Sequence, residues 1–154
     1  MVITSLPRFW LQDLTKLPQP KQGKAPPKLR STPLFDLVDI QQEVQSGRVS
    51  ADDVVLVTEQ ARKDRRDRLP WTSSDLFHYI ACLNPYKLGS AHDFKGAHWC
   101  LDSNGNWLAC DSYAMRYDSQ RRCRSAGGLD VYFKFSVDNQ GGLVLLVISL
   151  HPPR

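Results

Sequence analysis

The feature that most constrains the fold is a change in hydrophobic periodicity along the chain. Before residue 84 apolar residues recur at helical spacing, and later segments alternate apolar and polar residues. In "LDVYFKFSV", residues 129–137, valine and phenylalanine fall on one side of a strand, while Tyr132, Lys134 and Ser136 fall on the other. Helices followed by strands predict an α+β fold, with about three N-terminal helices packed on an antiparallel sheet of four or more strands.

Three helices are expected before the strands. The first carries an apolar stripe and ends at Gly47. The second is expected to follow Ser50, with the apolar residues 54–57 in its first turns. The third begins at "TSSD", residues 72–75, which has the spacing of a capping box, and stops before Asn84 and its following proline.

A first hairpin is predicted around Asn104-Gly105, a dipeptide typical of tight turns. With a two-residue turn, His98 would lie opposite Asp111, a carboxylate able to orient the imidazole. The same register would place Cys100 and Cys110 on opposite faces of the sheet.

A second hairpin is predicted across a four-residue loop at 139–142. It would pair Tyr132 with Ser149 and place both on one face with Lys134 and His151. The final strand is apolar throughout, so it is expected to be an interior strand covered on both faces. Ammonium, phenol and imidazole groups on one face indicate an anion-binding site.

Residues 1–33 differ in composition from the rest of the chain. They hold six of the ten prolines, six cations and one acid, Asp13. We expect a basic, proline-rich extension or linker with a possible short helix after Pro7, and a separate folded domain over residues 34–154. The exposed Trp10 of that helix would dock on the body or on a partner.

Composition excludes several classes of protein. No apolar run approaches the ~20 residues of a membrane helix, and the N-terminus lacks a secretory pattern, so a cytoplasmic protein without a membrane partner is expected. The four cysteines form no CxxC pair, which favours reduced thiols, with neither metal nor cofactor. A pairing of Cys82 with His78 as metal ligands is the weaker alternative to an exposed or proton-transferring histidine.

The net charge is +4, and nine of the twenty cations lie in residues 62–68 and 116–124. Arginines beside tyrosines suit phosphate binding and base stacking, which favours nucleic acid as the partner. The candidate substrate-binding residues are Arg116, Arg121, Arg122 and Tyr113, with His98 and Asp111.

From Phe35 onward, the order of short motifs resembles the motility quorum-sensing regulator (MqsR) toxins, small RNA-cleaving bacterial proteins with a RelE-like fold. The motifs are "DLFHYI" (75–80), "LACDSY" (108–113), "VYFKFSV" (131–137) and "VISLH" (147–151). The tyrosine and lysine of the third motif are present as Tyr132 and Lys134, whereas histidine replaces the lysine of the family at His78 and His151. The resemblance implies an mRNA interferase of a toxin–antitoxin system, a cognate antitoxin and possible ribosome association.

The sequence therefore predicts an endoribonuclease that acts without metal through attack of an RNA 2′-hydroxyl on the adjacent phosphorus. His78 and His151 would serve as base and acid in unassigned order, Lys134 with Arg116 or Arg121 would hold the phosphate, and Tyr132 would orient it. The alternatives are an RNA- or ribosome-binding module without catalysis, and a protein-interaction domain that uses the N-terminal arm.

Overall fold

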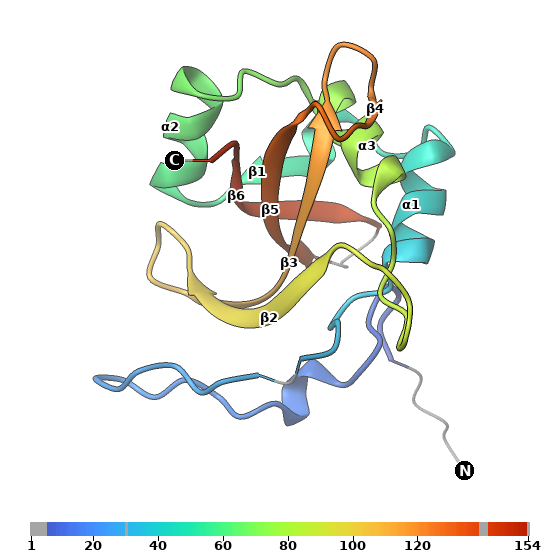
Figure 1. The fold of residues 1–154 in the computed structure, drawn as a ribbon. Helices are drawn as coiled ribbons and strands as arrows, with labels where there is room; N and C mark the ends of the chain where they lie inside the picture. The colour runs from blue at the N-terminus through green and yellow to red at the C-terminus, as the bar shows by residue number, and fades with distance from the viewer. Residues whose placement is uncertain (1–5, 30, 139–141, 154) are drawn as a thin grey trace.

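The fold is α+β. The computed structural model describes residues 6–29, 31–138 and 142–153. One mixed sheet of six strands has the order β1-β6-β5-β3-β2, with β4 attached to β3 (Figure 1). The predicted class is confirmed, but the sheet is mixed and not antiparallel throughout, because β1 pairs in parallel with β6.

The elements follow one another as helices first and strands later. The helices are α1 (Leu37–Gln45), α2 (Glu59–Asp67) and α3 (Ser73–Cys82), with short 3-10 turns at Leu14–Lys16 and Ala51–Asp53. The strands are β1 (Val54–Leu56), β2 (Phe94–Leu101), β3 (Trp107–Asp118), β4 (Cys123–Arg124), β5 (Leu129–Asp138) and β6 (Val144–His151).

The segment after Ser50 departs from the prediction. Its capping box with Asp53 forms, but it closes a single 3-10 turn. Residues 54–57 do not begin a helix, because Val54–Leu56 pairs in parallel with the outer edge of β6. Helix α2 starts later and is capped by Thr58, whose side chain accepts a hydrogen bond from the Ala61 amide. By contrast, the capping box that begins α3 at Thr72 forms as predicted.

Helix α3 covers the apolar face of the sheet. Tyr79 of this helix is fully buried against the sheet. It donates a hydrogen bond to the Val131 carbonyl at 2.7 Å and packs edge-on against Phe133. Strand β6 lies between β1 and β5 with Leu145 and Val147 fully buried, so its predicted interior position is confirmed. It is not covered on both faces throughout, because Ser149 and His151 near its end are partly exposed. The opposite side of the sheet is left for polar side chains.

The hairpin of β2 and β3 has a register that differs by one residue from the predicted one. Its loop contains five residues, because the Asp102 carboxylate accepts the amides of Asn104 and Asn106. Ala97 therefore lies opposite Asp111, and His98 lies opposite Cys110. The slip exchanges the two faces of β2 relative to β3, so the predicted pairing of His98 with Asp111 is wrong.

The hairpin of β5 and β6 keeps the predicted faces but not the predicted partners. Tyr132 lies opposite His151 and Lys134 opposite Ser149, with a bulge after Lys134. Because these pairs differ from the expected ones by two residues, the four side chains still share a face. Loop residues 139–141 lie outside the described residues. We call the side of the sheet that carries Tyr132, Lys134, Ser149 and His151 the polar face.

The sheet is curled. The amide of Ser103, in the loop after β2, donates to the Val57 carbonyl at 2.8 Å, and Arg62 donates to the Ser103 hydroxyl at 2.7 Å. Strand β2 is at one end of the sheet and β1, which precedes Val57, is at the other. A contact between these two ends requires strong curvature, and Figure 1 shows β2 bending accordingly.

The N-terminal arm, residues 6–29 and 31–33, packs against the body. It runs out beneath β2 and returns (Figure 1), with Phe9 buried in the core and Trp10 bridged to Phe35. The Trp99 indole donates to the Pro18 carbonyl at 3.0 Å, which ties the arm to β2. The arm forms a 3-10 turn at Leu14–Lys16 instead of the short α-helix expected after Pro7, and its first part contributes Phe9 to the core.

Candidate functional site

A hollow of about 260 Å³ lies on the polar face, and we call it the polar hollow. It is lined by Lys95, His98, Ser112, Tyr132, Lys134, Ser149 and His151, with Tyr113 and Phe133 contributing to its wall. These side chains come from four neighbouring strands, so the curled sheet itself positions them. Two imidazoles, two ammonium groups and a phenol in one hollow can bind a phosphate and move protons.

His151 is held by two contacts. Its ring stacks on Tyr132 with centroids 5.4 Å apart and an interplanar angle of 24°. Its Nδ1 lies 2.6 Å from the Pro152 carbonyl oxygen. Because a carbonyl only accepts hydrogen bonds, Nδ1 carries a proton, and Nε2 is the nitrogen left to exchange protons with a ligand.

His98 shares the polar hollow with His151, a placement that follows from the observed register. Its ring lies over Gly96, where an added Cβ would be 3.0 Å from Nε2, so glycine makes room for the imidazole. Burial and the positive charge of Lys134 lower the pKa of His98 below the usual 6.5. At neutral pH this imidazole is therefore mostly neutral and able to accept a proton.

Lys134 and Ser112 form the floor of the hollow as cross-strand neighbours on β5 and β3. The Ser112 hydroxyl is buried and forms no hydrogen bond with another described residue. Lys95 adds a second ammonium group from β2. Lys95 and Ser112 were not identified from the sequence. Phe94 and Ala97 are both buried although they are three residues apart, whereas residues on one face of a regular strand are separated by an even number. This irregular spacing is the signal for the bulge between Phe94 and Gly96, which turns Lys95 toward the hollow.

Two thiols lie beside this floor. Cys100 and Cys110 share a face, contrary to the prediction, because Cys100 lies opposite Leu108 and Cys110 lies opposite His98 across the hairpin. The hydrogen bond with the Cys110 thiol, followed by the charge of Lys134, lowers the pKa of Cys100 to about 7. Burial raises the pKa of Cys110. Both are free thiols, as expected from the sequence.

His78 lies away from this hollow. It is exposed on α3, on the side of the sheet opposite to the polar face, in a groove with Val44 and Phe77. Its Nε2 lies 2.9 Å from the Arg122 guanidinium. The prediction that His78 and His151 meet over one cationic floor is therefore wrong, because α3 packs on the apolar face. His98 takes the place that was expected for His78.

The three candidate arginines are engaged elsewhere. Arg116 points along the polar face beyond Tyr132, where it pairs with Asp130 at 3.5 Å and donates to the Ala126 carbonyl. Arg121 is exposed in the turn before β4 and lies 3.9 Å from Asp118. Arg122 joins α3 through its contacts with Asp75 and His78. None of the three lines the polar hollow.

Tyr113 and Asp111 are structural residues. Tyr113 is 1% exposed and stacks on Phe135 in the core, so its expected role in base stacking is wrong. Asp111 is fully buried and accepts hydrogen bonds from the Leu34 and Phe35 amides at 2.9–3.1 Å. Burial raises the pKa of this carboxyl to about 7. Asp111 therefore fastens the end of the arm to β3 and does not line the polar hollow.

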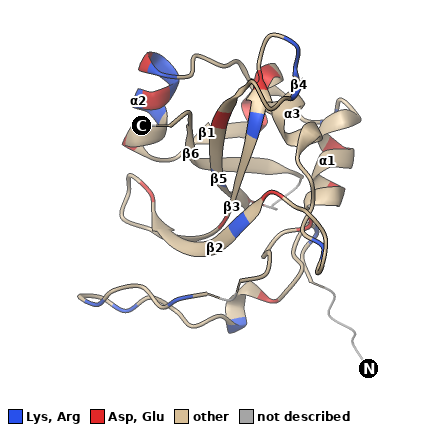
Figure 2. Cartoon of the chain, viewed as in Figure 1, with Lys and Arg blue, Asp and Glu red and all other residues tan. Residues whose placement is uncertain are grey.

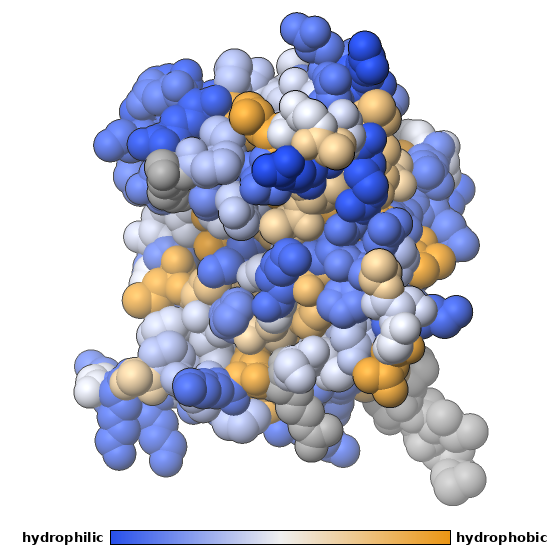
Figure 3. Space-filling view, in the orientation of Figure 1, coloured by the Kyte–Doolittle hydropathy of each residue, from blue (hydrophilic) through white to orange (hydrophobic). Residues whose placement is uncertain are grey.

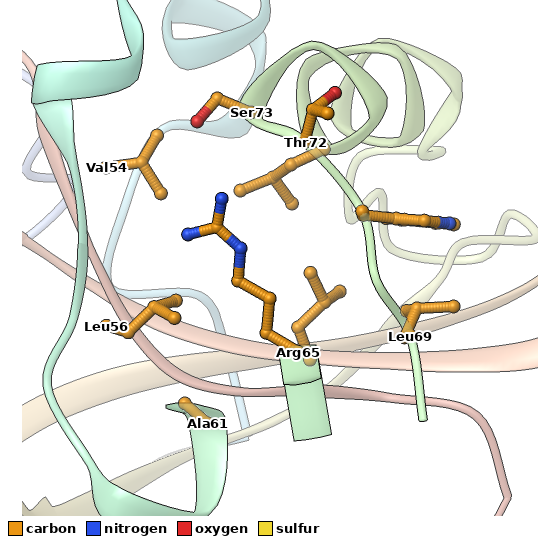
Figure 4. Close-up of a pocket in the computed structure, with 10 residues that line it drawn as sticks. Val54, Leu56, Ala61, Arg65, Leu69, Thr72 and Ser73 are labelled. Atoms are coloured by element: carbon orange, nitrogen blue, oxygen red, sulfur yellow. The ribbon is translucent and has the colours of Figure 1, made fainter. Parts of the chain in front are cut away.

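A second hollow lies between α2, α3 and β1 (Figure 4). Its walls are apolar, from residues such as Leu56, Leu69 and Leu76, and the Arg65 side chain projects between Val54 and Ser73. It has no imidazole, thiol or carboxylate among its lining residues. This hollow therefore lacks the acid–base groups that the polar hollow combines.

Within the described residues, no three His, Cys, Asp or Glu side chains gather in a way that could hold a metal ion. None of the described helices has the length and apolar character needed to cross a bilayer. Comparison of the chain with protein-family models, with curated proteins and with solved structures returns no match.

Proposed function

We propose that this protein is a toxin-like endoribonuclease whose active site is the polar hollow. The observation that supports this most directly is the presence of His98 and His151 in one hollow with Lys95 and Lys134. RNA cleavage by its own 2′-hydroxyl needs a base, an acid and cations around the phosphate. The hollow supplies all three from protein side chains alone, so the proposed reaction requires no metal.

In the proposed reaction His98 acts as the base. It takes the proton from the 2′-hydroxyl, and the 2′-oxygen attacks the adjacent phosphorus. The bond from phosphorus to the 5′-oxygen breaks, and His151 protonates that oxygen from Nε2. The products are a 2′,3′-cyclic phosphate and a free 5′-hydroxyl. The low pKa of His98 and the Nδ1 contact of His151 with Pro152 support this division of roles.

The other residues of the hollow hold the phosphate. Lys134 and Lys95 offset the charge that develops on the non-bridging oxygens. Tyr132 keeps the His151 ring in place through their stacking contact. Arg116 is held by Asp130, so Lys95 replaces it in the proposed phosphate site.

The resemblance to the MqsR toxins supports the same proposal, since Tyr132 and Lys134 of the shared motif line the hollow. We therefore propose an mRNA interferase with a RelE-like domain, acting in the cytoplasm. An antitoxin that covers the polar hollow and association with the ribosome belong to this proposal through the resemblance.

The experiment follows cleavage of a labelled RNA oligonucleotide in the presence of EDTA. His98→Ala and His151→Ala should each lower the rate about 100-fold or more, the usual effect of a positioned proton transfer. His78→Ala is the matched control, because this exposed histidine lies on the other side of the sheet, and its rate should equal that of the unaltered protein. Cleavage that depends on His78 but not on His98 would contradict the proposed site.

A cationic hollow also suits a module that binds RNA without cleaving it. In that case the protein would bind RNA in a salt-sensitive way and the EDTA assay would yield no product. The arrangement of two imidazoles favours the enzyme, because binding alone needs cations and rings but not two proton-transfer groups. The protein-interaction alternative expects an exposed Trp10 that binds a partner. In the structure Trp10 packs on the body through its bridge with Phe35, which disfavours that alternative.

A further inference from the structure

Three hollows adjoin one another from the polar face to the arm. The polar hollow shares His98 with a second one, the arm hollow, of about 290 Å³ between residues 26–29 and Trp99. The arm hollow shares Lys28 and Leu29 with a third, the outer hollow, of about 450 Å³ within the arm. The polar and arm hollows meet at β2, which is the terminal strand of the described sheet.

Cations mark this series of hollows. Lys134 and Lys95 line the polar hollow, Lys28 lines both the arm hollow and the outer hollow, and Lys16 lines the outer hollow. Lys21, Lys24 and Lys28 are exposed and form no ion pair with a described residue. By contrast, Lys16 interacts electrostatically with Asp13 of the same hollow, and Arg8 is paired with Asp39 and Glu43. Residues 1–33 contain one acid, Asp13.

The projecting part of the arm is hydrophilic and cationic. Figure 3 shows mostly hydrophilic side chains on its tip, and Figure 2 shows the lysines spaced along it. Unpaired cations in a row repel one another, and a polyanion relieves that repulsion by binding along them. Trp99 and the two prolines Pro26 and Pro27 supply flat apolar walls in the arm hollow, where a nucleobase can stack.

We infer that the substrate is single-stranded and that its nucleotides next to the reacting linkage cross the free edge of β2 and run along the arm. Lys28, Lys24 and Lys21 bind their phosphates, and the arm hollow takes a base. A single strand suits this path because its unpaired bases are free to enter the arm hollow and stack there, whereas the bases of a duplex are already paired and stacked. This inference rests on the proposed function for its substrate class, but its test needs no cleavage.

The test measures binding of fluorescent oligodeoxynucleotides, which lack the 2′-hydroxyl and stay intact, by anisotropy at several salt concentrations. A 12-mer and a dinucleotide are compared. The arm variant combines Lys21→Gln, Lys24→Gln and Lys28→Gln. The control variant removes the same charge from α2 through Lys63→Gln, Arg65→Gln and Arg66→Gln, all of them exposed and outside the three hollows.

The unaltered protein and the control should bind the 12-mer at least about tenfold more tightly than the dinucleotide, and the arm variant should lose that preference. The slope of log affinity against log salt should fall by about 2 in the arm variant, since each single-strand phosphate contact contributes about 0.7. Equal binding by the arm and control variants, or no preference for the 12-mer, would overturn the inference. Length-dependent binding without RNA cleavage would reject the proposed enzyme and leave the arm path standing.

Discussion

Asp111 gives a stability prediction that follows from its surroundings. Its carboxyl group is fully buried, and burial raises its pKa to about 7 from the usual 3.8, despite two amide donors from Leu34 and Phe35. The perturbation is Asp111→Asn, which keeps an acceptor oxygen for the amides and removes the titration. The comparison of the two proteins therefore isolates the pH dependence that comes from this carboxyl.

The sign and size follow from proton linkage. Between pH 3.8 and about 7 the folded protein keeps a proton on Asp111, while the unfolded chain has released it. The free energy of unfolding must then fall as the pH rises through this window and level off above it. Each tenfold difference in proton affinity corresponds to about 1.4 kcal/mol, so a pKa difference of about 3 predicts a loss of about 4 kcal/mol.

The assay is urea unfolding of both proteins from pH 4 to pH 8. Relative to Asp111→Asn, the unaltered protein should lose about 4 kcal/mol of unfolding free energy across this range. His98 titrates nearby with the opposite sign, because its pKa is lowered, but this contribution is present in both proteins and cancels. Parallel stability curves for the two proteins would refute the assignment of Asp111 as a buried carboxyl with a raised pKa.

Three further changes test other contacts. Lys134→Met removes the charge that lowers the pKa of His98, so the acid limb of the pH profile of kcat/KM should move to higher pH; a limb that stays in place contradicts that influence. Gly96→Ala places a Cβ 3.0 Å from the His98 ring at a backbone φ of 146°. The rate of cleavage should fall about 10- to 100-fold while the circular dichroism spectrum stays unchanged, and a normal rate would argue against the close approach of Gly96 and His98. Tyr79→Phe removes the hydrogen bond to Val131 and should lower the free energy of unfolding by about 1 kcal/mol in urea titration, with a cost near zero showing that the bond contributes nothing.

The alternation of apolar and polar residues predicts much of this fold. It identifies β5 and β6 and the side chains that share the polar face, since the face depends only on parity along each strand. It does not give the register of the β2–β3 hairpin, because five loop residues around Asp102 replace the expected two-residue turn. That difference of one residue places Ala97 opposite Asp111 and brings His98 to the polar face.

Two other departures arise from tertiary contacts that no local pattern contains. The apolar residues of β1 form a strand because the edge of β6 is available to pair with them, and three residues are too few to show a period. His78 was expected at the site from its place on the exposed side of α3. The helix, however, packs on the apolar face, so its exposed side points away from the polar hollow.

The most direct test of the central claim uses an RNA in which sulfur replaces the bridging 5′-oxygen of the reacting linkage. A thiolate leaves without protonation, so the acid is no longer needed while the base still is. His151→Ala should cleave this substrate within about tenfold of the unaltered protein, and His98→Ala should remain about 100-fold slower or worse. Recovery by neither variant, or by both equally, would contradict the assignment of His98 as base and His151 as acid in one hollow.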